Sequence, residues 1–287
     1  MREVRVVWAL LAADAVAVVV TYSRLPAHDL YSVHDPGLRG GLSRAVVELN
    51  FPDALIALAI LGVIAPLLPP ALRWVAAAAA VLCAYAVLPG VVQQSNLDAK
   101  WENAIPAAGV ALAFALTFLA RRPPPSRPRG DRVRVAVGAV LVVLAAPWIA
   151  AALGFYLDGV PVLDRLFQTG RLASFHDPLH HAVHHGVHHG LQGLLFALTA
   201  LILSRVPNRV SLYLALLLVF GAANMLNDGW LEQVVERGWS SHPVPSVLGF
   251  SLNWLWGATL VLAVAIWAAA RDGRPARRRP RTAAPPS

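Results

Sequence analysis

Eight long apolar runs limit what this chain can fold into. A membrane-spanning helix needs about 20 mainly apolar residues, and eight runs in the sequence approach that length. The runs are residues 6–22, 52–68, 71–92, 103–120, 133–155, 180–204, 209–226 and 247–270. Charged residues make up only 14% of the chain, well below their share in a soluble domain. The sequence therefore predicts an all-α polytopic membrane protein with eight transmembrane helices.

The basic residues between these runs predict the orientation. With the N-terminus in the cytoplasm, the inner segments hold 17 of the 24 Lys and Arg residues, and 12 of the 16 acids lie outside. Basic loops stay on the cytoplasmic side, so we expect both termini to be cytoplasmic and the protein to be integral to the plasma membrane. Because the arginines cluster in loops and the tail, we expect membrane lipids as partners and no nucleic acid.

The charge pattern also predicts four regions. Residues 1–120 form a first four-helix half, and 121–132 a basic, proline-rich cytoplasmic linker. Residues 133–270 form a second four-helix half with a histidine-rich helix, and 271–287 a disordered basic tail.

Two pairs of short motifs suggest that the halves are repeats. SVHDPGL at 32–38 resembles SFHDPLH at 174–180, and NLDAKWEN at 96–103 resembles LNDGWLEQ at 226–233. Each pair falls at equivalent points of the two halves. With four spans in each half, the sequence predicts a parallel 4+4 repeat about an axis along the membrane normal.

A histidine-rich segment is the main functional feature. The segment HDPLHHAVHHGVHHGLQG begins at His176 and holds seven of the ten histidines. Asp177 followed by Pro178 is typical of a helix start, and histidines three and four residues apart share a helical face. Polar side chains at the outer edge of a membrane are costly unless they face protein or water, so we expect a functional role.

This face predicts a transition-metal site, with zinc favoured over copper or iron. The single cysteine, Cys83, leaves imidazole and carboxylate as ligands. The predicted metal ligands are His34, Asp35, His176, His180, His181, His184, His185, His188 and His189. The predicted catalytic carboxylates, acting as general bases or orienting the imidazoles, are Asp177, Asp228 and Glu232.

Simpler roles are open for the same residues. The histidines could form a solvated collar, and Asp177 and Asp35 could each only cap a helix. Asp228 and Glu232 follow Asn224 at four-residue spacing and would share a face if the helix continues that far, with solvated loop acids as the alternative.

The spellings HAVHH at 181–185 and HGVHH at 185–189 resemble the HxxHH boxes of membrane fatty-acid desaturases and hydroxylases. In that family the boxes come from separate segments on the cytoplasmic side. Here they overlap on one predicted outward-facing helix, so the family's ligand roles are not carried over.

The sequence thus predicts an integral membrane metalloprotein with a histidine-rich site at the outer face, and a metal-dependent hydrolase of a membrane or lipid-linked substrate as the first expectation. A metal-ion transporter or metal-delivery protein is the alternative, with a path between the halves. A copper or diiron oxidase is the second alternative. A transporter would need acids deep in several spans, and the predicted spans contain almost none besides Asp14.

Overall fold

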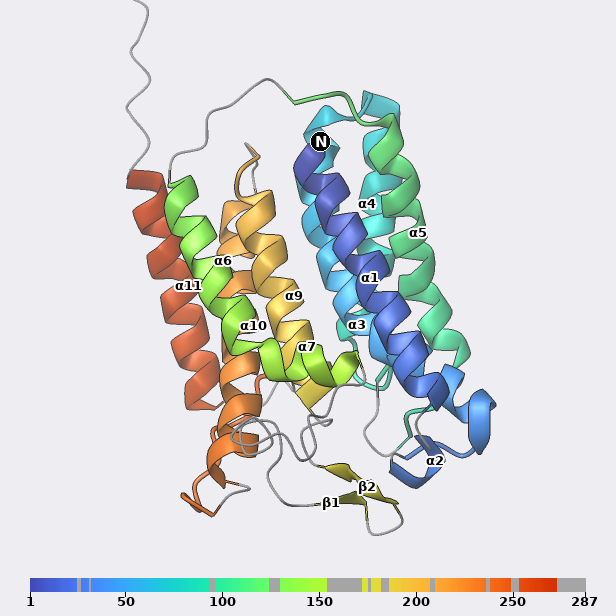
Figure 1. Ribbon diagram of the computed structural model, residues 1–287. Helices are drawn as coiled ribbons and strands as arrows, with labels where there is room; N and C mark the ends of the chain where they lie inside the picture. The colour runs from blue at the N-terminus through green and yellow to red at the C-terminus, as the bar shows by residue number, and fades with distance from the viewer. Residues whose placement is uncertain are drawn as a thin grey trace, which may run out of the picture.

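A computed structural model describes residues 1–24, 27–30, 32–92, 96–123, 130–153, 172–174, 177–181, 186–206, 210–235, 238–248 and 253–272. A long helix lies at each of the eight predicted runs, but the run 133–155 is divided between α6 and the short helix α7 (Figure 1). These helices are α1 (Arg2–Arg24), α3 (Gly37–Ile64), α4 (Pro70–Ala84), α5 (Ala104–Leu119), α6 (Asp131–Leu144), α9 (Gly186–Leu203), α10 (Ser211–Trp230) and α11 (Trp254–Asp272).

Smaller elements join the eight helices. They are α2 (Ala27–Leu30), α7 (Ala146–Ala152), the 3₁₀ turns Ala65–Leu67, Tyr85–Val87 and Trp101–Asn103, the π-helical turn Leu231–Val235, and the strands β1 (Leu172–Ser174) and β2 (Asp177–His181). Six helical segments of the described chain are long and apolar enough to cross a membrane, and they contain α1, α3, α4, α5, α10 and α11. The protein is therefore a helical, membrane-embedded protein.

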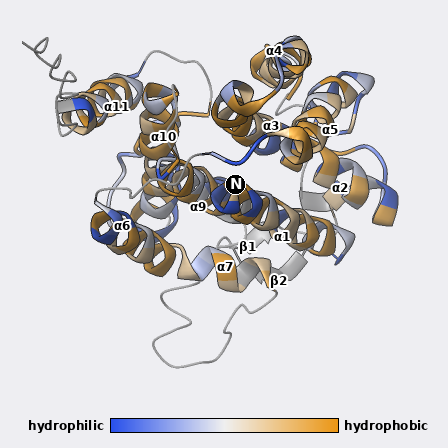
Figure 2. Cartoon of the chain, turned by 90° about the horizontal axis from the view of Figure 1, so that it is seen from above, coloured by the Kyte–Doolittle hydropathy of each residue, from blue (hydrophilic) through white to orange (hydrophobic). Residues whose placement is uncertain are grey.

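The outer surface of the bundle is apolar. Hydrophobic residues dominate the helices when the molecule is seen from above (Figure 2). Val81 of α4 and Val261 of α11 are about 70% exposed, which in water would be unfavourable over so many neighbouring residues. Lipid chains suit such a surface, because each helix satisfies its own backbone hydrogen bonds.

Helix α3 starts well before the predicted span. The sequence places the start of the span at Pro52, whereas the helix begins at Gly37 and passes through Pro52. The charged residues Arg44 and Glu48 interrupt the apolar run, but they are four residues apart and pair with each other inside the protein. The extended helix brings Glu48 and Asp53, predicted to lie outside the membrane, into a membrane-spanning segment.

The predicted start of the histidine-rich helix is wrong. Asp177 and Pro178 lie in strand β2, which pairs antiparallel with β1, and helix α9 begins only at Gly186. The residue before a proline is driven to extended backbone, and this preference prevails at Asp177. His180 and His181 are therefore on a strand, and no single helical face runs from Asp177 to His188.

Each half of the chain starts at the same end of the bundle, and the last described helix also ends there. The N-terminus, the start of α6 and the end of α11 lie at the top in Figure 1, and α2, β1 and β2 lie at the bottom. Helices α1 and α3 of the first half contact α9 of the second. Phe196 of α9 is fully buried and packs against Phe51 of α3 and Phe220 of α10, so the halves share one core.

Helices α9 and α10 are in very close contact. A Cβ atom added at Gly221 would lie 2.4 Å from the carbonyl oxygen of Gly193, and one added at Gly193 would lie 2.5 Å from that of Gly221. Only glycine fits at both positions, because the obstructing atoms belong to backbone. Gly190 of α9 likewise packs closely against the ring of Trp148 in α7.

The motifs behind the predicted repeat have different local structures. Pro36 immediately precedes helix α3, whereas Pro178 lies inside strand β2. Residues 101–103 form a 3₁₀ turn, whereas residues 226–233 lie in α10 and the π-helical turn. The repeat therefore stays a prediction.

Candidate functional site

Three polar side chains line one face of α10. Asn224, Asp228 and Glu232 are spaced four residues apart and are 1%, 4% and 3% exposed. The helix continues through Trp230 into the π-helical turn that contains Glu232. The predicted shared face is confirmed, and the alternative of solvated loop acids is wrong. Neither side-chain polar atom of Asn224 has a hydrogen-bond partner among the described residues.

The two acids of this face contact other elements of the second half. Asp228 Oδ2 accepts a hydrogen bond of 2.8 Å from the backbone N–H of Gly190, near the start of α9. Glu232 Oε2 accepts one of 3.2 Å from Trp148 Nε1. A Cβ at Gly190 would lie 2.2 Å from the Trp148 ring, so this glycine makes room for the indole beside both acids.

A second group of polar residues joins the two halves. The Arg44 guanidinium is 2.5 Å from Glu48 Oε2, and both side chains are about 5% exposed. Arg44 also lies over the Tyr22 ring of α1, 5.1 Å from its centroid. The side-chain amide of Gln192 in α9 donates hydrogen bonds to Glu48 Oε1 and, at 3.3 Å, to its backbone carbonyl. Glu48 is thus held from both sides of the boundary between the halves.

Two more acids continue this group along α1 and α3. Asp14 lies close enough to interact electrostatically with both Glu48 and Asp53. Glu48 interacts in the same way with Asp228. Asp53 Oδ1 accepts no hydrogen bond from a described residue. The acids therefore form a connected series, which we call the carboxylate column: Asp14, Glu48, Asp53, Asp228 and Glu232.

The column carries more acid than base. Of its five carboxyl groups, Glu48 is paired with the Arg44 guanidinium. A charge inside a membrane protein is costly unless it is paired, solvated or neutralised. Burying these carboxyl groups is therefore costly.

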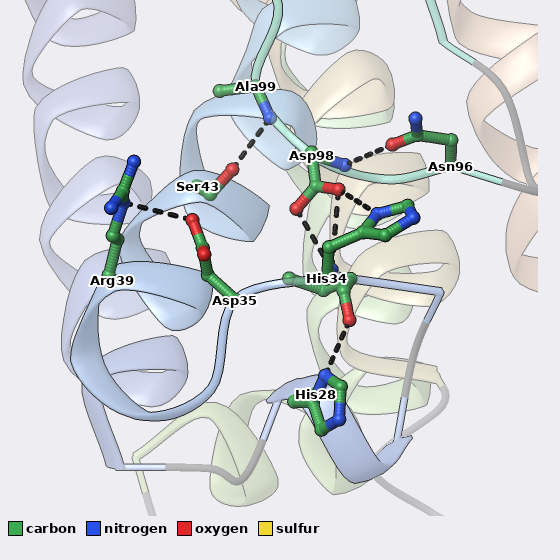
Figure 3. Close-up of polar contacts among 9 residues, drawn as sticks. His28, His34, Asp35, Arg39, Ser43, Asn96, Asp98 and Ala99 are labelled. Carbon is green, nitrogen blue, oxygen red and sulfur yellow. Dashed lines mark hydrogen bonds and ion pairs between the residues drawn. The ribbon is translucent and has the colours of Figure 1, made fainter.

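The predicted outer residues of the first half are paired with other side chains (Figure 3). His34 Nδ1 lies 2.5 Å from Asp98 Oδ2, and the His34 backbone N–H donates to the same carboxylate. Asp35 pairs with Arg39 at 2.9 Å, so it does not cap α3, whose N-cap residue is Pro36. The contacts of His34 with Asp98 hold the loop before α3 against the segment that contains Asp98.

The predicted metal ligands are not brought together in the described structure. No group of three or more His, Cys, Asp or Glu side chains in the described ranges could hold a metal ion. His189 is half-buried in α9. For the other predicted residues of this segment, either the whole residue or its side chain lies outside the part of the chain that the structure describes. These residues are His176, Asp177, His180, His181, His184, His185 and His188.

Sequence reasoning identified Asp14 as an acid within a span but missed Glu48 and Asp53 as members of the carboxylate column. The apolar-run pattern places Glu48 and Asp53 in an outer loop, because they lie before or at the very start of the run. One signal could have identified them, since the segment AVVELNFPDALIALAI from Ala45 has isolated acids between apolar residues. Arg44 lies four residues before Glu48, the spacing of an intrahelical ion pair.

Comparisons with known proteins identify no relative. No protein-family model matches the chain, and neither a curated protein nor a solved structure is detectably similar to it. The function is therefore inferred from the carboxylate column alone.

Proposed function

We propose that this chain is an integral membrane transporter of cations, with the carboxylate column as the conducting path. The observation that carries the proposal is the series of five buried or half-buried carboxyl groups at the boundary of the two halves, where Gln192 of α9 binds Glu48 of α3. Several carboxyl groups inside a membrane protein are costly and are by default candidates for a functional site, which supports a role beyond fold stability.

The depth of the acids supports a path. At about 1.5 Å of rise per residue, Asp14 lies about 18 Å along α1 from Arg2, and Asp53 about 17 Å along α3 from Ile64. By the same rule Asp228 lies about 25 Å along α10 from Ser211, with Glu232 about 6 Å further. The start of α1, the end of α3 and the start of α10 lie at the same end of the bundle (Figure 1). The column therefore runs from the end that holds β1 and β2 to about mid-membrane.

The membrane topology completes the proposal. Eight crossings with both termini and the basic linker in the cytoplasm follow the positive-inside rule, and place the histidine-rich end outside the plasma membrane. The histidine-rich segment would capture cations there and pass them to Glu232 and Asp228. The parallel repeat would place the path between its halves, as in many transporters.

In this proposal the predicted transition-metal site binds the cation that is to be transported. Imidazole suits zinc best among the expected metals, followed by copper and iron, so Zn²⁺ is the first metal to test. The metal-dependent hydrolase and the copper or diiron oxidase stay predictions that no described contact favours.

Transport by reconstituted protein tests the proposal. We expect proteoliposomes to take up protons or Zn²⁺ faster than protein-free liposomes, with each ion reported by an encapsulated dye. Asp228→Asn and Asp14→Asn keep the side-chain shape but remove the charge. Each should slow uptake about tenfold or more, which corresponds to about 1.4 kcal/mol in the barrier.

Asp131→Asn is the matched control. Asp131 pairs with Arg205 at the linker end of the bundle, away from the column, so this variant should transport at the parent rate. Uptake of neither ion above the protein-free rate would overturn the proposal. Equal uptake by parent, Asp228→Asn and Asp14→Asn proteins would overturn the column as the path.

A further inference from the structure

A cavity at the opposite end of the bundle is lined by three arginines. It has a volume of about 490 Å³ and lies between the start of α1 and the segment after α5. Its basic residues are Arg2 and Arg5 of α1 and Arg122. The lining also contains Met1, Glu3, Val6, Ala9 and Pro123.

The arginine side chains have no described function in the fold. Arg2, Arg5 and Arg122 are exposed, and their guanidinium groups make no hydrogen bond or ion pair with any residue in the described ranges. The lining acid Glu3 is instead 3.8 Å from the Met1 amino group. Three like charges around one cavity repel each other, and an anion bound between them would relieve that repulsion.

The rest of the lining indicates what kind of anion fits. Val6 and Ala9 are exposed and continue the cavity along α1 toward the apolar surface of the bundle. The site thus has guanidinium groups where lipid headgroups lie and an apolar wall where acyl chains begin. Guanidinium groups bind phosphate oxygens through paired hydrogen bonds. Basic pockets of this kind at the ends of transmembrane helices suit phospholipid headgroups.

We propose that this cavity binds the phosphate-containing headgroup of an anionic phospholipid. The site is separate from the carboxylate column and does not depend on transport. Bound lipid would join the start of α1 to the end of α5, next to the hydrogen bond of 3.0 Å from Trp8 Nε1 to Thr117 Oγ1.

Native mass spectrometry of the full chain in detergent tests this inference with three probes. These are phosphatidylglycerol, phosphatidylcholine and inorganic phosphate. We expect phosphatidylglycerol to bind more tightly than phosphatidylcholine and to resist displacement by millimolar phosphate. The triple variant Arg2→Gln, Arg5→Gln, Arg122→Gln should weaken phosphatidylglycerol binding about tenfold or more, from the loss of three basic side chains.

Two further variants keep the test decisive. Arg122→Gln leaves the two α1 arginines in place for membrane insertion and should still weaken binding severalfold. Arg132→Gln removes an exposed arginine at the same end but outside the cavity, and should bind as the parent does. Equal loss with Arg132→Gln, equal binding of the two lipids, or displacement by free phosphate would each overturn the proposal.

Discussion

Glu48→Ala is expected to lower the free energy of unfolding by about 3–5 kcal/mol, because it leaves the Arg44 guanidinium buried without its carboxylate. Arg44 is 5% exposed and cannot turn to water without unpacking the Tyr22 ring. The change also removes one of the two acceptors of the Gln192 side chain, the Glu48 carboxylate, which weakens the boundary between the halves. Unfolding of the purified protein in mixed micelles, followed by circular dichroism against SDS concentration, measures the loss.

The same helix supplies a matched control. Asp35 and Arg39 are also an acid and an arginine four residues apart, but they are exposed. Asp35→Ala should cost less than about 1 kcal/mol, as exposed ion pairs do. The double change Arg44→Met, Glu48→Met should recover most of the stability, because it removes both buried charges. Equal losses from Glu48→Ala and Asp35→Ala would contradict the buried pair.

Gly221→Val should destabilise the protein by about 3 kcal/mol, near the upper end for overfilled positions. The first added atom would lie 2.4 Å from the Gly193 carbonyl oxygen, which belongs to the backbone of α9 and cannot rotate away. The helices must therefore separate, and the Asp228 contact with Gly190 should loosen with them. Thermal unfolding measures the loss of stability. Slower transport per folded molecule would show that the loosened Asp228 contact also affects the carboxylate column.

Gly257→Ala is the control for this change. Gly257 also lies in a membrane helix, α11, but nothing is within 4 Å of an added Cβ. Because alanine is favoured over glycine in helices by up to about 1 kcal/mol, this variant should be as stable as the parent or more so. If Gly221→Val matched Gly257→Ala in stability, the close approach of α9 and α10 would be wrong.

The positions of the eight helices could be predicted because long apolar runs leave the backbone no alternative within a membrane. The start of α3 could not be predicted, because the charged residues Arg44 and Glu48 are typical of a loop and are compatible with a buried helix only when they pair with each other. At Asp177 and Pro178 the sequence suits both a helix start and an extended strand. Antiparallel pairing with β1, which ends three residues earlier at Ser174, selects the strand.

The candidate site could likewise be predicted from the sequence only in part. The four-residue spacing of Asn224, Asp228 and Glu232 is enough to predict their common face, because the whole pattern lies within one continuous helical segment. The contact between Gln192 and Glu48 joins residues 144 positions apart, and only tertiary packing brings them together. The described end of the histidine-rich segment contacts the carboxylate column, since Gly190 binds Asp228 and Gln192 binds Glu48.

The contact between Gly193 and Gly221 also limits how the protein can move. With their backbones in contact at these two glycines, α9 and α10 would move together. Phe51 and Glu48 of α3 contact this pair through Phe196 and Gln192 of α9. In the transport proposed above, exposing the acids first to one side of the membrane and then to the other would therefore move the α9–α10 pair relative to α1 and α3, and would break and remake the hydrogen bond between Gln192 and Glu48.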